Sequence, residues 1–316
     1  VVRDLESDQV IQVKAKATIM AAGVWSDPLH SSYGLKPGYG VRMSKGAHIV
    51  VPGDAIKSET GVIIKTDVSV LFIIPWGENW IVGTTDTDYD QSREEPLATA
   101  DDVTYIINQA NRVLEPKLRR DQVIGVFAGL RPLVSTDPDS PTTKLSREHV
   151  VDSPTRGFVS IAGGKYTTYR IMAEDAVNEA VNHLRRLVPD SETETLAIIG
   201  AEGYSVLMNQ IPMLAEKFGL TPKTVEHLLN RYGSLIDEVL APAAENKELL
   251  SKVSDELPYI TAELLYAVTH EGARSVDDVL SRRTRIAFEA KDQGLALVEK
   301  VADLIAPHIG WKKSDK

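Results

Sequence analysis

The chain contains no cysteine, and this absence excludes disulfide bonds, thiolate metal ligands and cysteine nucleophiles. It also fits a reducing compartment such as the cytoplasm. Basic residues are outnumbered, because 35 Lys and Arg stand against 45 Asp and Glu and the net charge is -10. Since nucleic-acid phosphates are bound by clustered Lys and Arg, we expect no nucleic-acid partner. No apolar run reaches the roughly 18 residues that a transmembrane helix needs.

The length of the chain predicts two domains. At roughly 150 residues per domain, 316 residues suffice for two. We expect residues 1–190 to form a strand-rich domain and residues 200–316 to be almost entirely helical, because short β-type runs give way to helical spacing after the polar stretch 189–194. The chain begins at Val1 inside an expected hairpin, so we expect a piece of a longer protein.

Local patterns place the elements. Apolar and alternating runs predict strands at 10–14, 18–23, 62–64, 71–75, 80–83 and 158–162, and residues 96–113 read as a helix. In the second part, Thr221 is an expected N-cap with a proline after it, and Gly233 closes that helix. Ser275 and Asp278 resemble a capping box, and a final helix is expected at 294–309.

The most informative run is Gly-Gly-Lys-Tyr-Thr-Thr-Tyr-Arg at residues 163–170, between an expected strand and an expected helix. Paired glycines let backbone approach a ligand closely, and the N–H groups of a first helical turn favour negative charge. An anion, or a cofactor that becomes anionic, suits such a site. The alternative is an ordinary turn with a solvated Lys165. The helix is expected to bury one apolar stripe: Val177, Ala180, Val181, Leu184 and Leu187.

Three further positions are candidates for chemistry. The small-residue turn at Ala22 and Gly23 ends a buried strand and would admit a flat cofactor, or it is a packing turn. His48, at the start of an apolar strand, is a candidate general base or else a structural histidine. Arg131 lies in a hydrophobic stretch, where its charge needs an internal carboxylate or an anionic ligand.

Metal binding is not expected. Asp86, Asp88 and Asp90 alternate as calcium ligands do, but the sixth and twelfth positions of an EF-hand loop counted from Asp86 are Gln91 and Leu97. The histidines show no zinc-like spacing.

Taken in order, these motifs closely resemble FAD-dependent glycerol-3-phosphate dehydrogenase, of the D-amino-acid-oxidase-like flavoprotein superfamily. The resemblance covers residues 1–170 and resumes at 270–284. It is carried by Ala-Ala-Gly-Val-Trp-Ser-Asp at 21–27, Lys-Gly-Ala-His-Ile-Val-Val-Pro at 45–52, Ile-Pro-Trp at 74–76, Val-Gly-Thr-Thr-Asp at 82–86, Gly-Leu-Arg-Pro-Leu at 129–133 and the run at 163–170.

The resemblance implies roles for individual residues. His48, Arg131 and Lys165 match the family's active-site histidine, arginine and lysine, with His48 as first candidate for the base and Arg131 as the other. Arg147 stands where the family has a substrate-side arginine, so Arg131 and Arg147 would hold the phosphate. The implied flavin-contacting residues are Ala22, Gly23, Gly163, Gly164, Lys165, Thr167 and Thr168.

The implied reaction is oxidation of sn-glycerol 3-phosphate to dihydroxyacetone phosphate, with hydride passing to FAD and electrons to a quinone-type acceptor. The implied location is the cytoplasm, with peripheral contact at the inner face of the plasma membrane left open, as is a homodimer. The implied fold is α+β: a partial FAD-binding and substrate-cap domain with an antiparallel sheet at 1–190, then an all-α domain at 200–316.

One departure matters. No Gly-x-Gly-x-x-Gly follows a strand anywhere in the chain, although this fingerprint holds the pyrophosphate of FAD in the family. We therefore expect the C-terminal portion of the enzyme, lacking the N-terminal Rossmann βαβ unit, and we expect it alone to bind FAD poorly and not to turn over.

Two alternatives stay open. One is another oxidase of the same superfamily, acting on an amino acid or a 2-hydroxy acid, in which Arg131 would clamp a carboxylate. The other is a helical module at 200–316 that docks a flavoprotein onto a partner or membrane, suggested by Arg282, Arg283 and Arg285.

Overall fold

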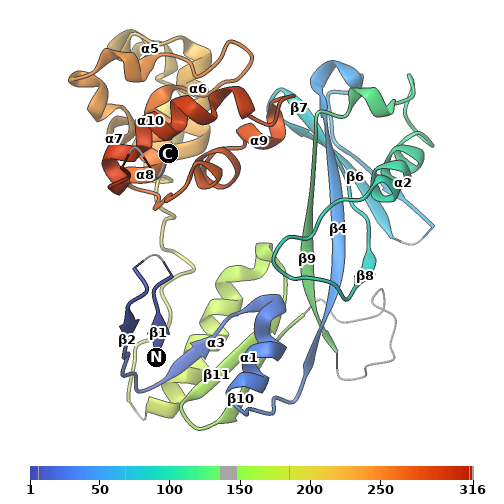
Figure 1. The fold of residues 1–316 in the computed structure, drawn as a ribbon, viewed down its shortest axis with the longest axis vertical. Helices are drawn as coiled ribbons and strands as arrows, with labels where there is room; N and C mark the ends of the chain where they lie inside the picture. The colour runs from blue at the N-terminus through green and yellow to red at the C-terminus, as the bar shows by residue number, and fades with distance from the viewer. Residues whose placement is uncertain (6, 68, 136–147, 185, 313, 315–316) are drawn as a thin grey trace.

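The computed structural model describes residues 1–5, 7–67, 69–135, 148–184, 186–312 and 314. Three bodies are visible in Figure 1: a helical region, a long antiparallel sheet, and a small sheet with a covering helix beside the N-terminus. No helix within the described ranges is both long and apolar enough to cross a membrane.

The large sheet has six strands in the order β5-β6-β7-β4-β8, with β9 paired to the other edge of β4. The pairings between its described strands are antiparallel, as the alternating runs predict. Its strands are β4 (Gly40–Pro52), β5 (Val62–Lys65), β6 (Val70–Trp76), β7 (Asn79–Gly83), β8 (Thr87–Tyr89) and β9 (Gly125–Ser135).

Helix α2 (Ala100–Ala110) covers one face of this sheet. Thr99 caps it in a complete capping box with Asp102, and Val103 and Ile106 are buried against the strands. A buried ion pair fixes the helix to β4, because Lys45 Nζ lies 2.7 Å from Asp102 Oδ2. The helix expected at 96–113 is thus present in a shorter form.

The small sheet has the order β10-β11-β3, with β3 parallel to β11. Its strands are β3 (Thr18–Met20), β10 (His149–Thr155) and β11 (Phe158–Gly163), and a separate hairpin joins β1 (Val2–Arg3) to β2 (Val10–Ile11). Helix α3 (Tyr169–Leu184) packs on β11, preceded by the 3-10 turn η5 (Tyr166–Thr168). Helix α1 (Ser26–Ser32) follows the 3-10 turn η1 (Gly23–Trp25).

The stripe expected for α3 is only partly right. Ala180 is buried, together with Ala176, but Val177 is 49% exposed and Leu187 is fully exposed. Val177 thus lies outside the contact with the sheet, and Leu187 lies beyond the end of α3 at Leu184.

The second region is helical from α4 onward and has two hydrophobic cores. The N-cap at Thr221 and the box of Ser275 with Asp278 form as expected. The helices are α4 (Tyr204–Met208), α5 (Ile211–Phe218), α6 (Pro222–Tyr232), α7 (Ile236–Leu240), α8 (Thr261–Thr269), α9 (Ile286–Glu289) and α10 (Val298–Ile309), with a π-helical turn at Asp278–Arg283.

The α+β fold expected from the sequence is therefore confirmed: a mixed-sheet region precedes a helical one. Where the two regions meet, α9 packs on β9, and Lys223 Nζ lies 3.1 Å from Glu78 Oε1 of the β6–β7 turn.

Candidate functional site

Two of the expected flavin-contacting turns leave the small sheet at the same edge. Ala22 and Gly23 follow β3, and Gly163 and Gly164 end or follow β11. Because these neighbouring strands are parallel, their carboxyl ends lie side by side. This edge is where ligands bind in parallel α/β sheets, so the structure brings both turns into a position suited to one ligand.

Gly163 and Gly164 are both required at their positions. Their φ angles are 77° and 75°, in the region that residues with a Cβ rarely adopt. A Cβ at Gly163 would lie 2.6 Å from the carbonyl oxygen of Glu148, and one at Gly164 would overlap Met172. Glycine is therefore required at both positions by the backbone conformation and by the neighbouring parts of the chain.

Lys165, Thr167 and Thr168 follow this turn and are exposed. The Thr168 hydroxyl accepts a hydrogen bond from the Lys165 backbone N–H at 3.2 Å and donates to the Lys165 carbonyl at 3.0 Å. The exposed 3-10 turn η5 precedes α3 and begins directly after the lysine. This arrangement suits negative charge at the same edge of the sheet.

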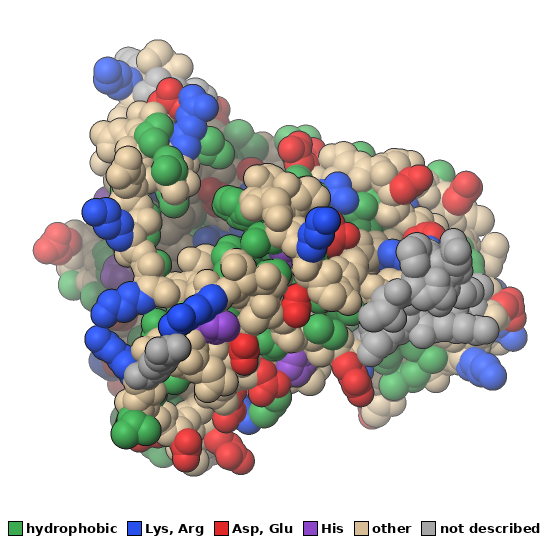
Figure 2. Space-filling model, turned by 90° about the horizontal axis from the view of Figure 1, so that it is seen from below, with side chains coloured by type: hydrophobic (Ala, Val, Ile, Leu, Met, Phe, Trp, Pro, Cys, Tyr) green, Lys and Arg blue, Asp and Glu red, His purple; other side chains and the backbone are tan. Residues whose placement is uncertain are grey.

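The end of the molecule that carries this turn has apolar as well as charged side chains on its surface. Tyr166, Tyr169 and Ile171 are respectively 92%, 53% and 43% exposed. In Figure 2, which looks at the molecule from below, hydrophobic side chains lie between basic and acidic ones.

The sequence predicted His48 at the start of a strand, but the residue lies well inside β4. Its ring stacks on Phe127 of β9, with centroids 4.9 Å apart and an interplanar angle of 10°. Gly83 of β7 leaves room for it, since a Cβ there would overlap the imidazole. Its Nδ1 is buried and has no hydrogen-bond partner within the described part of the chain.

Burial, aided by the positive charge of Arg131, lowers the pKa of His48 from 6.5 to about 4. The imidazole is therefore neutral near pH 7 and can accept a proton. A ligand anion beside it would oppose the effect of Arg131 and raise this pKa.

Arg131 comes from β9 and lies across β4. A Cβ at Gly46 would overlap its guanidinium, so the absence of a side chain at Gly46 lets the Arg131 side chain lie over β4. It donates to the Thr84 hydroxyl at 2.8 Å and to the Thr85 carbonyl at 3.2 Å. The internal carboxylate that its position requires is Asp86, whose Oδ1 lies 3.9 Å from Nη1.

Thr84 and Asp86 are residues that sequence reasoning did not place in the site. The Asp86 side chain is 3% exposed and accepts a hydrogen bond from Ser44 of β4. The signal was available in the run Val-Gly-Thr-Thr-Asp, which carries two hydroxyls and a carboxylate directly after a strand. Spacing alone did not show that these groups face Arg131, because β4 lies between them in the sheet.

The structure thus brings His48 and Arg131 together on β4 and β9, and Gly23 with Gly163, Gly164 and Lys165 at the edge of the small sheet. The two groups are connected, since the Val134 side chain of β9 lies where a Cβ of Gly163 would be. Arg147 lies outside the described residues, and its expected role stays a prediction.

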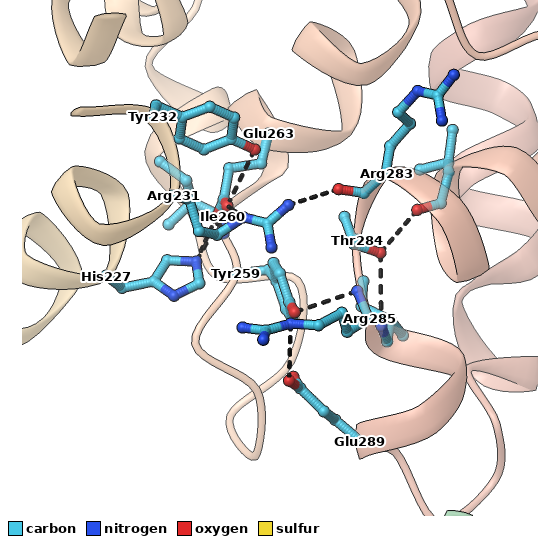
Figure 3. A network of polar contacts seen from close by, with 12 residues as sticks. His227, Arg231, Tyr232, Tyr259, Ile260, Glu263, Arg283, Thr284, Arg285 and Glu289 are labelled. Carbon is cyan, nitrogen blue, oxygen red and sulfur yellow. Dashed lines mark hydrogen bonds and ion pairs between the residues drawn. The ribbon is translucent and has the colours of Figure 1, made fainter. Parts of the chain in front are cut away.

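A second polar cluster lies in the helical region, and sequence reasoning missed it (Figure 3). Glu263 is fully buried and accepts hydrogen bonds from His227 at 3.0 Å and from the Ile260 backbone N–H at 2.9 Å. Arg231 Nε lies 3.2 Å from the same carboxylate. The partners of Glu263 are thus supplied within the region, which is typical of a structural cluster.

The three arginines that suggested a docking module have internal partners. Arg282 pairs with Asp277 and Asp278, Arg283 donates to the Glu271 carbonyl, and Arg285 lies over the ring of Trp76 with its Nε 3.4 Å from Glu289. A cleft of about 620 Å³ between the regions has basic and acidic side chains in its lining, among them Lys223, Glu78 and Arg285. Because both charges are present in the lining, the cleft does not favour a partner of one charge.

Comparison with known families gives two matches along the chain. The family described as FAD dependent oxidoreductase matches residues 1–170, more than half of the 316 residues. The family described as C-terminal domain of alpha-glycerophosphate oxidase matches residues 191–316.

Similar proteins carry a consistent name. The chain is 46% identical to a glycerol-3-phosphate dehydrogenase of Mycobacterium leprae (strain TN), over 99% of this chain and 54% of that protein. It is 32% identical to the mitochondrial glycerol-3-phosphate dehydrogenase of Homo sapiens, over 98% of this chain and 43% of that one. The chain spans about half the length of the curated relatives it matches.

A solved structure is similar over the whole chain. The glycerol-3-phosphate dehydrogenase of Bacillus halodurans, complexed with FAD, has a TM-score of 0.83 at 30% identity, covering 99% of this chain and 62% of that chain. These matches confirm the resemblance inferred from the sequence motifs.

Proposed function

Because this chain belongs to the FAD-dependent oxidoreductase family, we propose that the protein it forms part of oxidises sn-glycerol 3-phosphate to dihydroxyacetone phosphate. The observation that carries the proposal is the position of His48 on β4 near Arg131 on β9, with a glycine making room for each side chain. Its relatives' names supply the substrate class.

His48 is the proposed acceptor of the C2-hydroxyl proton. It is neutral near pH 7, and its buried Nδ1 has no partner within the described residues. Arg131 cannot take this role, because a guanidinium stays protonated in proteins. Of the two candidates for the base that the motifs suggested, the charge argument thus favours His48.

Arg131 is the proposed phosphate holder. Its guanidinium is held in one orientation by Thr84, Thr85 and Asp86, and a planar guanidinium suits recognition of a phosphate. Anchoring the remote phosphate would align the C2 carbon and its hydroxyl beside His48. Arg147 is proposed as a second phosphate ligand on the family resemblance.

Bound FAD would supply the hydride acceptor. Gly23, Gly163 and Gly164 would lie against it with bare backbone, and Lys165 with the amides of η5 would hold negative charge next to it. We propose that this chain alone binds FAD poorly, because it has no dinucleotide fingerprint. A titration in which the isolated chain binds FAD tightly at one equivalent would refute this.

The test of the function uses the protein restored to the full length of its relatives and loaded with FAD. Anaerobic addition of sn-glycerol 3-phosphate should bleach the flavin absorbance, and His48→Ala should slow bleaching by roughly 10²- to 10⁴-fold, the usual share of a general base. Arg131→Ala should raise the substrate concentration that is needed. Matched controls are His308→Ala and Arg156→Ala at exposed positions.

Each outcome decides a point. Bleaching by an amino acid or a 2-hydroxy acid but not by the phosphate ester would assign the other oxidase activity, in which Arg131 binds a carboxylate. Bleaching that is unchanged in His48→Ala would remove the histidine from the proton transfer and leave the substrate assignment standing.

We also propose a quinone-type electron acceptor and a peripheral association with a membrane surface, on the resemblance to the respiratory members of the family. Reoxidation of the reduced, full-length protein by a soluble quinone should be faster than by oxygen. Equal rates with both acceptors would contradict the proposal. Sedimentation with anionic lipid vesicles at low salt tests the membrane contact.

A further inference from the structure

The helical region reaches the candidate site through one short helix. Helix α9 packs on β9, and its Phe288 meets Phe127 edge-on, with ring centroids 5.5 Å apart and an interplanar angle of 62°. Backbone also lies against backbone, because a Cβ on Gly125 would overlap the Phe288 carbonyl. Two independent features therefore fix α9 at this strand.

Phe127 also contacts His48, so it connects Phe288 with the histidine. The two residues are register partners on β9 and β4, so their side chains lie on the same face of the sheet. The rings stack 4.9 Å apart and nearly parallel. On the side of β7, Gly83 offers no side chain, so the imidazole plane is set by Phe127.

Helix α9 itself is held by the buried polar cluster of the helical region. The Arg285 backbone N–H, at its start, donates to the Tyr259 hydroxyl at 3.2 Å, and Thr284 donates to the Val279 carbonyl at 2.7 Å (Figure 3). The Arg285 guanidinium also lies 4.5 Å from the ring centroid of Trp76. Phe288 is thus presented by a helix with little freedom to move away.

We propose that Phe288 is a positioning residue for His48: acting through Phe127, it fixes the plane and the dry surroundings of the imidazole, so that the helical region completes the site formed by the sheet. The placement of the Phe288, Phe127 and His48 rings is a structural statement that does not depend on the activity of the protein. The consequence for turnover rests on the proposed function, in which His48 accepts a proton.

Among the described residues, the charged groups near His48 come from β9 and from the segment after β7. Arg131 comes from β9 on one side, and Asp86, after β7, lies behind its guanidinium at 3.9 Å. Gly83 and Phe127 add no charge. Loss of Phe288 would let the Phe127 ring turn and admit water to the imidazole, which weakens the burial that keeps it neutral.

The first test is NMR titration of the histidine rings in this chain, with the His48 signal assigned through His48→Gln. Phe288→Ala should move the pKa of His48 from about 4 toward 6.5 and reduce the ring-current shift from Phe127. Gly125→Ala should do the same by pushing α9 off the strand while every aromatic ring is kept. Phe288→Tyr, which retains the ring, should behave as the unaltered chain.

Phe218→Ala is the matched control, because Phe218 is a half-buried phenylalanine packed on a core of the same helical region. It should loosen that region without moving the His48 signal. If Phe288→Ala and Gly125→Ala, both folded by circular dichroism, leave the titration and the ring-current shift of His48 unchanged, the proposal is wrong.

Kinetics of the full-length, FAD-loaded protein separate this inference from the function. Phe288→Ala should lower kcat by roughly tenfold to a hundredfold, the cost of a base misplaced by about 1 Å, and change KM for sn-glycerol 3-phosphate little. Equal loss in kcat and in phosphate binding would mark a general structural defect and overturn the positioning role. Absence of turnover in the unaltered protein would refute the function alone, since the NMR result is independent of it.

Discussion

The main polar clusters of the two regions differ in how fully they are enclosed. In the sheet region, His48 and Arg131 are only partly enclosed, and bare glycine backbone leaves room for each side chain. In the helical region, Glu263 is fully buried and shared by several donors. In the helical region a buried carboxylate is thus held by donors of the same region, whereas the sheet site places His48 and Arg131 beside glycines that make room for them.

The difference follows from the cost of burying charge. A carboxylate removed from water needs partners that are always present, so the helical region supplies them from its own chain. A site for an anionic substrate must leave part of its donors for the ligand. Arg131 is oriented by Thr84, Thr85 and Asp86, and its side chain remains 29% exposed.

The largest expected effect comes from removing the centre of the helical network. Glu263→Ala leaves Arg231 without its carboxylate and should lower the free energy of unfolding by about 3–5 kcal/mol, the usual cost of breaking a buried ion pair. Urea unfolding followed by circular dichroism measures it. Glu256→Ala, at an exposed position, should stay within about 0.5 kcal/mol. Comparable losses in both variants would show that the network is not structural.

A smaller effect is expected from the turn at the edge of the small sheet. Gly163→Ala must hold a Cβ at φ 77° against the Glu148 carbonyl, so it should cost about 1–3 kcal/mol. Gly129→Ala is the matched control in β9, where nothing lies within 4 Å of an added Cβ. Thermal unfolding of both variants would test this. A Gly163→Ala protein as stable as the control would mean that the turn relaxes freely and is not a preformed cradle.

A response to pH of opposite sign is expected in the two regions. His48 has a pKa of about 4 in the folded chain and 6.5 unfolded, so the sheet gains stability as pH rises from about 4 to 6.5. Burial raises the pKa of Glu289 and of Glu271 in the helical region, so their contribution falls as pH rises above 4.5.

Hydrogen exchange resolved by peptide measures the two responses separately. Protection of β4 and β9 should increase between pH 4 and 6.5 after correction for the intrinsic rate, and His48→Gln should remove the increase. Protection around α9 should decline over the same range, less so in Glu289→Gln. If protection changed with pH in the same direction in both regions, the predicted difference between them would be wrong.

Local sequence predicted the positions of helices and strands well, but it predicted less well which residues of an element are buried. The cap at Thr221, the box at Ser275 and the strand before Gly163 were predictable, because capping and alternation depend on residues a few positions apart. The stripe of α3 was partly wrong, since burial of Val177 depends on what lies against the helix and α3 ends before Leu187.

The motifs indicated His48, Arg131 and the glycine turns of the candidate site. The structure adds the residues that contact His48 and Arg131. Thr84 and Asp86 face Arg131 only because β9 and β7 flank β4. Phe288 reaches His48 across 240 residues of chain through Phe127, a contact with no local signal.

By itself, the sequence determined the α+β character, the division into a strand-rich and a helical part, the absence of thiol chemistry, and the residues able to bind an anion or accept a proton. These depend on composition and short-range spacing. The tertiary structure alone decided which of those residues meet, which glycines yield space to a neighbour, and that the helical region touches the site through α9. Such contacts join segments distant in the chain, so they arise from packing and not from any local pattern.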